Sequence, residues 1–306
     1  MYNVTIFGIN ITVDPVAFTI PIGSGWQVYW YGIIIATGFL LAVLYGLKTA
    51  DRYSLNKDKI MDGVLIVAPI AILCARIYYL IFDGEKLESI GDFFGFTSKG
   101  FSGLAIYGAV IGAIVSGAIV CKLFKMNVLD VFDVMSVSFL IGQAIGRWGN
   151  FVNQEAFGTL TNSKFWGMQS ERTIAEVGKG LVHPCFLYES VWCVIGFFLL
   201  NHFTKKRQFK GQIVLMYCAW YGFGRAIIEL LRTDSLMIGN LRVSFLLSLI
   251  ICIGALVTLG FKLKGGFVSA KVKAQEQEYV PMFADIEDTE PEQTTNTGED
   301  ENGTDN

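Results

Sequence analysis

Long apolar runs alternate with short polar segments through most of this 306-residue chain. Seven of the runs are about 20 residues long, which is the length that an α-helix needs to cross the hydrocarbon core of a bilayer. The pattern therefore predicts an all-α, polytopic membrane protein with seven transmembrane helices. The predicted helices cover residues 27–47, 60–82, 101–124, 128–148, 184–203, 212–231 and 243–261.

The composition agrees with this prediction, and it distinguishes the C-terminal segment from the rest of the chain. Hydrophobic residues make up 53% of the chain, more than an ordinary soluble domain contains. After Lys273 the chain has no Lys or Arg and many Asp and Glu. Such a segment buries too little apolar surface to offset the entropy of ordering it. We expect a membrane domain over residues 1–265 and a disordered acidic tail over residues 266–306.

Basic residues follow every second apolar run and predict the orientation. If the helices alternate in direction, these residues all lie on one side, which the positive-inside rule assigns to the cytoplasm. The N-terminus is then outside, the tail is cytoplasmic, and residues 149–183 form a small external head, with residues 3–21 at the outer interface. The basic residues are Lys48, Arg52, Lys57, Lys59, Lys122, Lys125, Lys205, Lys206, Arg207, Lys210, Lys262, Lys264, Lys271 and Lys273.

Four arginines fall in the outer half of the predicted membrane domain. A charged side chain at this depth is costly, so its default interpretation is a functional site with an anionic or polar partner. For Arg147 and Arg225, which lie on different helices, the sequence favours binding of an anion such as a lipid phosphate. For Arg76, Arg232 and the nearby Glu229, a structural ion-pair network is an equal alternative.

The spacing in the sixth run places polar residues on one helix face. Tyr221, Arg225, Glu229 and Arg232 are separated by four, four and three residues, so they stack along the helix. We expect Glu229 to neutralise and orient one arginine. His183, just before the fifth run, is either a solvated loop residue or part of the site.

Glycines recur in the third run, including Gly108 and Gly112. Small residues four apart let helices approach closely in a membrane. Tight packing is the favoured explanation, over a direct role in the site.

Residues 146–158, with Arg147, Asn150, Asn153 and Glu155, resemble the signature of bacterial prolipoprotein diacylglyceryl transferases. Supporting blocks occur in the same order along residues 26–260. These blocks are Tyr31–Gly32, Ala75–Tyr79, Ile106–Gly108, His183–Pro184, Leu187–Glu189, and Tyr221–Gly222 with Arg225, Glu229 and Arg232.

The resemblance implies a reaction, its partners and a location. A diacylglyceryl group would move from phosphatidylglycerol to the lipobox cysteine thiol of a preprolipoprotein, forming a thioether and releasing glycerol 1-phosphate. The implied partners are phosphatidylglycerol, lipobox-containing preprolipoproteins and membrane lipids, with no nucleic acid. The resemblance implies a seven-span enzyme of the bacterial plasma membrane whose active site faces the outer leaflet.

The same resemblance assigns roles to individual residues. Arg147 and Arg225 would hold the phosphate and stabilise the charge that grows on it, while tyrosines line the lipid pocket. The expected catalytic residues are Arg147, Arg225, Tyr31, Tyr107 and Glu155. The expected substrate-binding residues are Arg76, Arg147, Asn150, Asn153, Gly158, His183, Tyr188, Glu189, Tyr221, Glu229 and Arg232.

The chain departs from the family pattern at two positions. Many members have a histidine where this chain has Tyr107, and a free tyrosine is a poor base near neutral pH. Either Tyr107 substitutes by hydrogen bonding, or the base is elsewhere or unnecessary, so the base stays unassigned. The second departure is Phe245, where glutamine is common after Ser244; we expect that segment, from Arg242, to touch no proposed chemistry.

Two other functions use the same arginines. A transporter of an anionic lipid or solute would bind its cargo there, but the sequence shows no internal repeat of the kind common in transporters. An inactive homologue that retains lipid binding would explain Tyr107. The sequence contains no metal-ligand cluster or nucleotide-binding loop, so no cofactor is expected.

Overall fold

The computed structural model describes residues 1–21, 26–83, 93, 103–233, 237–239 and 241–264. It contains the seven predicted helices, each long and apolar enough to cross a membrane. The predicted tail, 266–306, lies outside the described residues, as does the beginning of the third predicted run. The seven helices are α1 (Trp30–Thr49), α2 (Lys57–Asp83), α4 (Ile106–Leu123), α5 (Val128–Val152), α7 (Cys185–Thr204), α8 (Gln212–Leu231) and α9 (Val243–Lys264).

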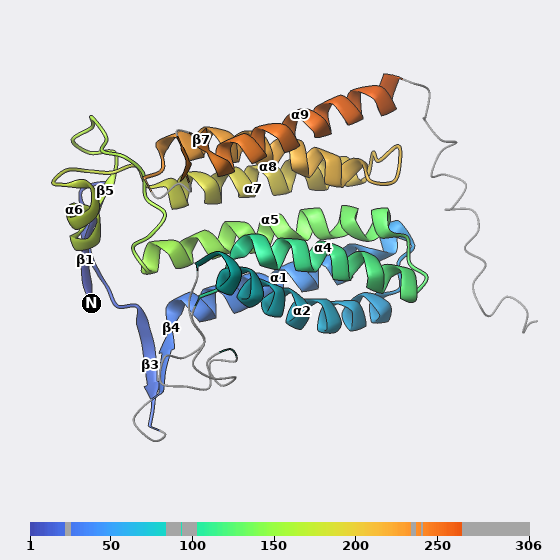
Figure 1. Ribbon diagram of the computed structural model, residues 1–306, viewed down its shortest axis with the longest axis horizontal. Coiled ribbons are helices and arrows are strands. Elements are labelled where there is room, and N and C mark those ends of the chain that lie inside the picture. Colours follow the sequence, from blue (N-terminus) through green and yellow to red (C-terminus); the bar gives the residue numbers. More distant parts are fainter. Residues whose placement is uncertain (22–25, 84–92, 94–102, 234–236, 240, 265–306) are drawn as a thin grey trace, which may run out of the picture. The chain divides into compact units, whose positions relative to one another are not determined.

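Helix α5 is the centre of the membrane domain. It packs against α1, α7 and α8, while α2 pairs with α4 and α8 pairs with α9, as Figure 1 shows. Asn127 caps its N-terminus by accepting hydrogen bonds from the backbone N–H groups of Leu129 and Asp130 at 3.1 and 3.2 Å. Because α5 contacts both helical pairs, side chains at its C-terminal end can meet residues from several helices.

The glycines of α4 pack tightly against α2, which confirms the favoured interpretation. A methyl group added to Gly108 would lie 2.5 Å from the Cys74 carbonyl oxygen, and one added to Gly112 would lie 2.6 Å from Cys74 Cβ. Both distances are too short for a real contact. Glycine at these positions lets the two helix backbones approach each other.

The predicted head is built from two distant parts of the sequence. Strands β1 (Tyr2–Ile6) and β2 (Ile9–Val13) form an antiparallel hairpin, and β5 (Met168–Ser170) pairs with the other edge of β1. Helix α6 (Glu171–Val177) follows β5 directly, with Ser170 forming a capping box. The expected head at residues 149–183 therefore needs the N-terminal strands as well. A shared apolar core contains Val4, Phe151, Phe157, Met168, Val182 and Phe186.

Two smaller hairpins flank helices at the same end of the domain. Strands β3 (Val16–Ile20) and β4 (Trp26–Tyr29) are antiparallel, and β4 leads directly into α1. Strands β6 (Met237–Ile238) and β7 (Leu241–Arg242) precede α9.

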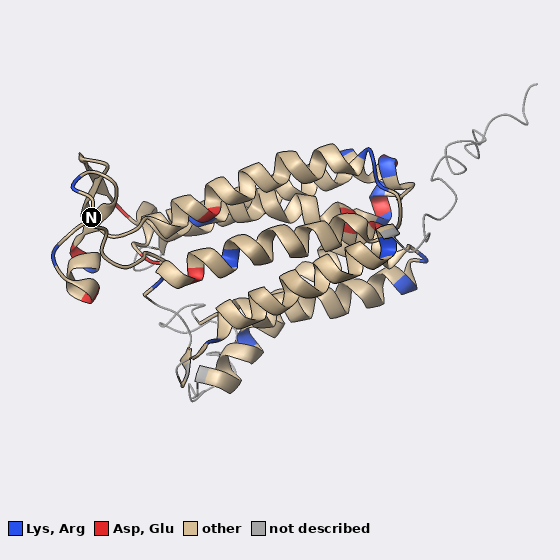
Figure 2. Cartoon of the chain, turned by 90° about the horizontal axis from the view of Figure 1, so that it is seen from above, with Lys and Arg blue, Asp and Glu red and all other residues tan. Residues whose placement is uncertain are grey.

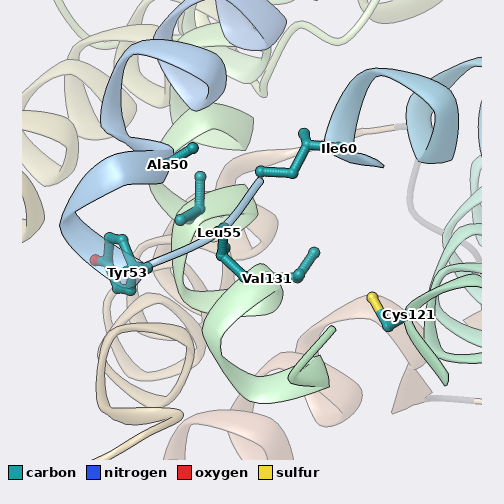
Figure 3. Packing of buried hydrophobic residues seen from close by; sticks show 7 residues of the cluster. Ala50, Tyr53, Leu55, Ile60, Cys121 and Val131 are labelled. Carbon is teal, nitrogen blue, oxygen red and sulfur yellow. The ribbon is translucent and has the colours of Figure 1, made fainter. Parts of the chain in front are cut away.

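The opposite end of the helices is basic and separately packed. The short helix η1 (Ala50–Tyr53) links α1 to α2, and its residues pack with Leu55, Ile60, Cys121 and Val131 in the apolar cluster of Figure 3. Lys and Arg gather at this end of the helices in Figure 2. The charge segregation predicted from the sequence is therefore present in the folded domain, whereas its direction across a membrane stays a prediction.

Candidate active site

Three helices converge on the carboxylate of Glu189, which is only 2% exposed. From α5, Arg147 Nη2 lies 2.5 Å from Glu189 Oε1. From α8, the Tyr221 hydroxyl donates to the same oxygen at 2.6 Å, and Arg225 Nη1 lies 3.5 Å from Glu189 Oε2. We call Arg147, Glu189, Tyr221, Arg225 and Glu229 the arginine–glutamate cluster. It brings the two arginines from different helices to opposite oxygens of one carboxylate.

Glu189 is placed by the beginning of α7. Pro184 precedes this helix, and Glu189 follows within its first two turns. The next residue, Ser190, donates a hydrogen bond from Oγ to the Ala144 carbonyl oxygen at 2.8 Å, which joins α7 to α5 one turn before Arg147. This bond fixes the position of α7 along α5 and therefore brings Glu189 to the level of Arg147.

The face of α8 that the sequence predicted is present in the structure. Arg225 Nη2 lies 2.5 Å from Glu229 Oε2, four residues along, and Glu229 is 1% exposed. This confirms that Glu229 neutralises and orients an arginine. The Tyr217 ring stacks on Tyr221 with centroids 5.6 Å apart, and its hydroxyl donates to Gln143 of α5 at 3.2 Å. The two tyrosines thereby fix the α8 face against α5.

A polar network continues from Arg147 to Glu155. Arg147 Nη1 donates to Asn150 Oδ1 at 3.2 Å, and Asn150 Nδ2 donates to Glu155 Oε1 at 3.0 Å. Asn153 Nδ2 reaches the same oxygen at 3.4 Å. Tyr31 at the start of α1 lies against α5 here, since a methyl group on Gly149 would be 2.8 Å from its ring. The expected site residues of α1 and α5 are thus brought together.

The backbone around Glu155 has an unusual conformation. Gln154 and Ala156, on either side of it, have φ values of 55° and 59°. A left-handed conformation is unfavourable for residues other than glycine, and such residues often occur at functional sites. Gln154 is fully buried and donates from Nε2 to the Phe151 carbonyl oxygen at 2.5 Å. This turn could not be predicted from the sequence, because neither residue is a type that prefers a left-handed conformation.

Gly158, His183 and Tyr188 meet at the beginning of α7, the helix that carries Glu189. The Gly158 N–H donates to the His183 carbonyl oxygen at 2.8 Å, and a side chain at Gly158 would collide with Cys185 and the Leu231 backbone. His183 Nδ1 and the Tyr188 hydroxyl are 3.2 Å apart, and that hydroxyl accepts from Trp166 Nε1 at 2.7 Å. His183 is therefore a half-buried, hydrogen-bonded residue at the beginning of α7.

Tyr107 joins α4 to α9. Its hydroxyl lies 2.8 Å from Ser244 Oγ. This contact corrects our expectation that the segment from Arg242 to Phe245 touches no proposed chemistry, because Tyr107 is one of the expected catalytic residues. Arg242 in the same segment donates to the carbonyl oxygens of Glu229 and Arg232, so it caps the C-terminus of α8.

Of the two remaining arginines, Arg76 lies about two turns before the C-terminal end of α2, and Arg232 is the C-cap residue of α8. Arg76 of α2 is 3% exposed, donates to the Gly103 carbonyl oxygen at 3.2 Å and lies over the Tyr79 ring at 5.6 Å. Arg232 ends α8, where its N–H donates to the Glu229 carbonyl oxygen at 3.3 Å. The positions of Arg76 and Arg232 fit both anion binding and structural pairing.

Metal chemistry has no obvious site in the described residues. Within those ranges, no three His, Cys, Asp or Glu side chains gather where they could hold an ion. The arrangement consists instead of guanidinium, amide and phenol donors around buried carboxylates, which suits the recognition of an anion.

The comparisons with known proteins cover the part of the chain that contains these residues. The family model for prolipoprotein diacylglyceryl transferase matches residues 15–261. Proteins named phosphatidylglycerol–prolipoprotein diacylglyceryl transferase are 39% identical in Clostridioides difficile and 41% identical in Listeria innocua, each over 246 residues. The alignments cover 80% and 79% of this chain and 94% and 87% of those relatives. A relative of the same name from Limosilactobacillus reuteri is 37% identical over 265 residues, covering 82% of this chain and 92% of its own. The chain is therefore a multi-pass membrane protein that belongs to the prolipoprotein diacylglyceryl transferase family.

Proposed function

We propose that this protein transfers the diacylglyceryl group of phosphatidylglycerol to the lipobox cysteine of preprolipoproteins. The observation that carries the proposal is the arginine–glutamate cluster, in which Arg147 and Arg225 from two helices meet one buried carboxylate. The three blocks that supply it are those that resemble the family signature. Family membership supports the reaction class, and the contacts of the cluster support this location for it.

The lipid phosphate would bind at the two arginines. A guanidinium has five N–H donors in a planar fork. Within the part of the chain that the structure describes, Arg147 uses only some of its donors, in hydrogen bonds to Glu189 and Asn150. Glu189 holds both forks in place before substrate arrives, so little reorganisation is needed. Arg76 and Arg232 would add positive charge around the phosphate, and Glu229 would complete the binding site by holding Arg225 in place.

The chemical step breaks one bond and forms another at a glycerol carbon. The cysteine sulfur attacks the carbon that carries the phosphate ester, a carbon–sulfur bond forms, and the carbon–oxygen bond breaks. Glycerol 1-phosphate leaves with the electron pair, and the thiol proton passes to a base or to the leaving phosphate. Fixed donors aimed at the growing negative charge accelerate such a step, and removing one typically costs about 100-fold or more in rate.

The other expected residues would orient the two substrates. Asn150, Asn153 and Glu155 form a polar network next to Arg147 that suits the glycerol hydroxyls of the head group. Tyr31 and Tyr221 would line the lipid pocket. His183, Tyr188 and Gly158, at the beginning of α7 and in the loop before it, would contact the peptide or the head group.

Tyr107 would act through hydrogen bonding rather than as the base. Its hydroxyl is already engaged with Ser244 across α4 and α9. A tyrosine in this position preserves a polar contact where many family members have histidine. The identity of the group that accepts the thiol proton remains unassigned.

The site would face the outer leaflet of the bacterial plasma membrane. The charge distribution supports this orientation, because the basic end of the helices lies opposite the head (Figure 2). In a variant whose native cysteines are replaced, Asn10→Cys in β2 should react with a membrane-impermeant reagent on intact cells. Lys125→Cys, between α4 and α5, should react only after the membrane is opened; the reverse pattern would overturn the orientation.

A transfer assay tests the proposed function. Purified protein is mixed in detergent with phosphatidylglycerol and a synthetic lipobox peptide, and the thioether product and glycerol phosphate are measured together. Equal amounts of both products, without any membrane gradient, would support the transferase and exclude a transporter. A folded protein that binds the lipid but forms neither product would contradict the proposal and favour the inactive lipid-binding homologue.

A further inference from the structure

Two tryptophans form a reciprocal pair between α7 and α8. The indole rings of Trp192 and Trp220 stack with centroids 4.1 Å apart and an angle of 9° between their planes. Trp192 Nε1 donates to the Trp220 carbonyl oxygen at 3.0 Å, and Trp220 Nε1 donates to the Trp192 carbonyl oxygen at 3.1 Å. Each side chain therefore bonds the backbone of the other helix.

A glycine one turn further along each helix makes room for this pair. Gly196 follows Trp192 by four residues, and Gly224 follows Trp220 by four. A methyl group on Gly196 would overlap the Trp220 indole, and one on Gly224 would overlap the Trp192 indole. The same Trp-x-x-x-Gly pattern on two antiparallel helices thus interlocks, each indole filling the space above the other helix's glycine.

The interlock lies next to the arginine–glutamate cluster along both helices. Glu189 precedes Trp192 by three residues on α7, while Tyr221 and Arg225 directly follow Trp220 and Gly224 on α8. A carbonyl oxygen used by an indole cannot shift along the helix axis without losing the hydrogen bond. A slide of one helix against the other would break both bonds and separate Glu189 from Tyr221 and Arg225.

We propose that Trp192 and Trp220, with Gly196 and Gly224, are positioning residues that fix the register of α7 against α8 and thereby the geometry of the two catalytic arginines. This inference rests on the proposed function, because it assigns the register a role in transfer. The tryptophans act through Glu189, Tyr221 and Arg225 and do not touch the reacting atoms.

The test compares kcat per folded molecule in conservative variants. Trp192→Phe and Trp220→Phe each remove one indole donor and should lower kcat about fivefold, the effect of one net hydrogen bond. Trp26→Phe, on the exposed strand β4, is the matched control and should leave kcat unchanged. Unchanged kcat in folded Trp192→Phe and Trp220→Phe would overturn the proposal.

A double-mutant cycle separates register from general packing. Gly224→Ala drives a methyl group into the Trp192 indole and should lower kcat about 30-fold, an estimate for displacing both site residues of α8. Adding Trp192→Phe removes the nearest colliding atom, the indole Nε1, so the double variant should be more active than Gly224→Ala alone. Gly254→Ala on α9 meets open space and is the matched control. Additive losses in the double variant would contradict the interlock.

A measurement without catalysis keeps the inference distinct from the proposed function. In protein labelled with isotopic tryptophan, the assigned indole N–H signals of Trp192 and Trp220 should be protected from hydrogen exchange in the wild type and in Gly254→Ala. Both should lose protection in Gly224→Ala. If the wild type shows protected indole signals but no transfer, the proposed function alone is contradicted. If Gly224→Ala loses this protection but keeps a normal kcat, the positioning role is overturned.

Discussion

The two ends of the membrane domain each hold a buried charged cluster, and the clusters are built differently. At the basic end, Arg207 lies 2.5 Å from Asp130 and 3.1 Å from Asp133, and its guanidinium covers the Tyr53 ring at 4.6 Å. Asp133 also accepts from the backbone N–H groups of Gly211 and Val214, at 2.9 and 2.8 Å. This carboxylate is therefore tied to the N-terminus of α8.

The arginine–glutamate cluster at the other end joins side chain to side chain. Glu189 is bonded by Arg147, Tyr221 and Arg225, which come from two other helices. Contacts of this kind can be exchanged for contacts to a substrate without unwinding a helix, whereas the Asp133 contacts cannot. The comparison teaches that buried ion pairs in one protein are built in two ways, anchored to backbone groups at the basic end and joined side chain to side chain near the head, where we propose that an anion binds.

A large effect on catalysis should come from neutralising the carboxylate at the centre of the site. Glu189→Gln keeps the shape but leaves the two arginines without their shared charge partner, so their mutual orientation weakens. We expect kcat to fall about 100-fold, since hydrogen bonds to charged groups contribute about 1.5–3 kcal/mol each. KM for phosphatidylglycerol should stay the same or fall, because the arginines become more available to phosphate. Steady-state kinetics check this, and an unchanged kcat would show that Glu189 does not organise the site.

The matching change at the basic end should affect stability instead. Arg207→Ala leaves Asp130 and Asp133 buried without their arginine, and breaking a buried pair in this way costs about 3–5 kcal/mol. Unfolding in denaturant should show this loss, while kcat per folded molecule stays within about twofold of the wild type. Lys57→Ala, which removes an exposed pair with Asp51, is the control and should change stability very little. A large loss of kcat in folded Arg207→Ala would contradict the proposed difference between a structural cluster at the basic end and a catalytic cluster near the head.

A smaller effect should follow from removing one hydroxyl at Glu189. Tyr221→Phe deletes the 2.6 Å hydrogen bond but keeps the ring that stacks on Tyr217. We expect kcat to fall about tenfold, the value of one hydrogen bond to a charged group. Tyr217→Phe, whose hydroxyl bonds Gln143 instead, should have a weaker effect in the same assay. Equal losses in the two variants would show that the effect does not depend on the hydrogen bond to Glu189.

The smallest catalytic effect should come from Tyr107. Tyr107→Phe removes the bond to Ser244 and should lower kcat about threefold, as expected for one neutral hydrogen bond. Ser244→Ala removes the same bond from the other side and should have a similar effect. A loss of 100-fold or more in Tyr107→Phe alone would show that the Tyr107 hydroxyl takes part in the chemistry directly.

The sequence predicted those features whose signals are local. Apolar runs of helix length gave all seven spans, and the four-residue spacing of Tyr221, Arg225 and Glu229 gave the shared face of α8. The glycines at 108 and 112 gave the close approach of α4 to α2. These patterns depend on helix periodicity and hydropathy, which a sequence records directly.

Features that join distant segments could not be predicted in this way. The pairing of β1 with β5 connects residues more than 160 positions apart, and the meeting of Glu189 with Arg147 depends on how α5 packs against α7. The interlock of Trp192 and Trp220 has a repeated Trp-x-x-x-Gly pattern, which is visible only once the helices are known to be antiparallel neighbours. The left-handed residues Gln154 and Ala156 have no local signal at all.

Transfer by Arg147→Ala tests the central claim most directly. This variant leaves Glu189 paired with Arg225 and Tyr221, so the protein should insert and fold like the wild type, which circular dichroism checks. With phosphatidylglycerol and a lipobox peptide at saturating concentrations, we predict that thioether formation falls by at least about 100-fold. A folded Arg147→Ala protein that forms the thioether at the wild-type rate would contradict the assignment of the arginine–glutamate cluster as the active site.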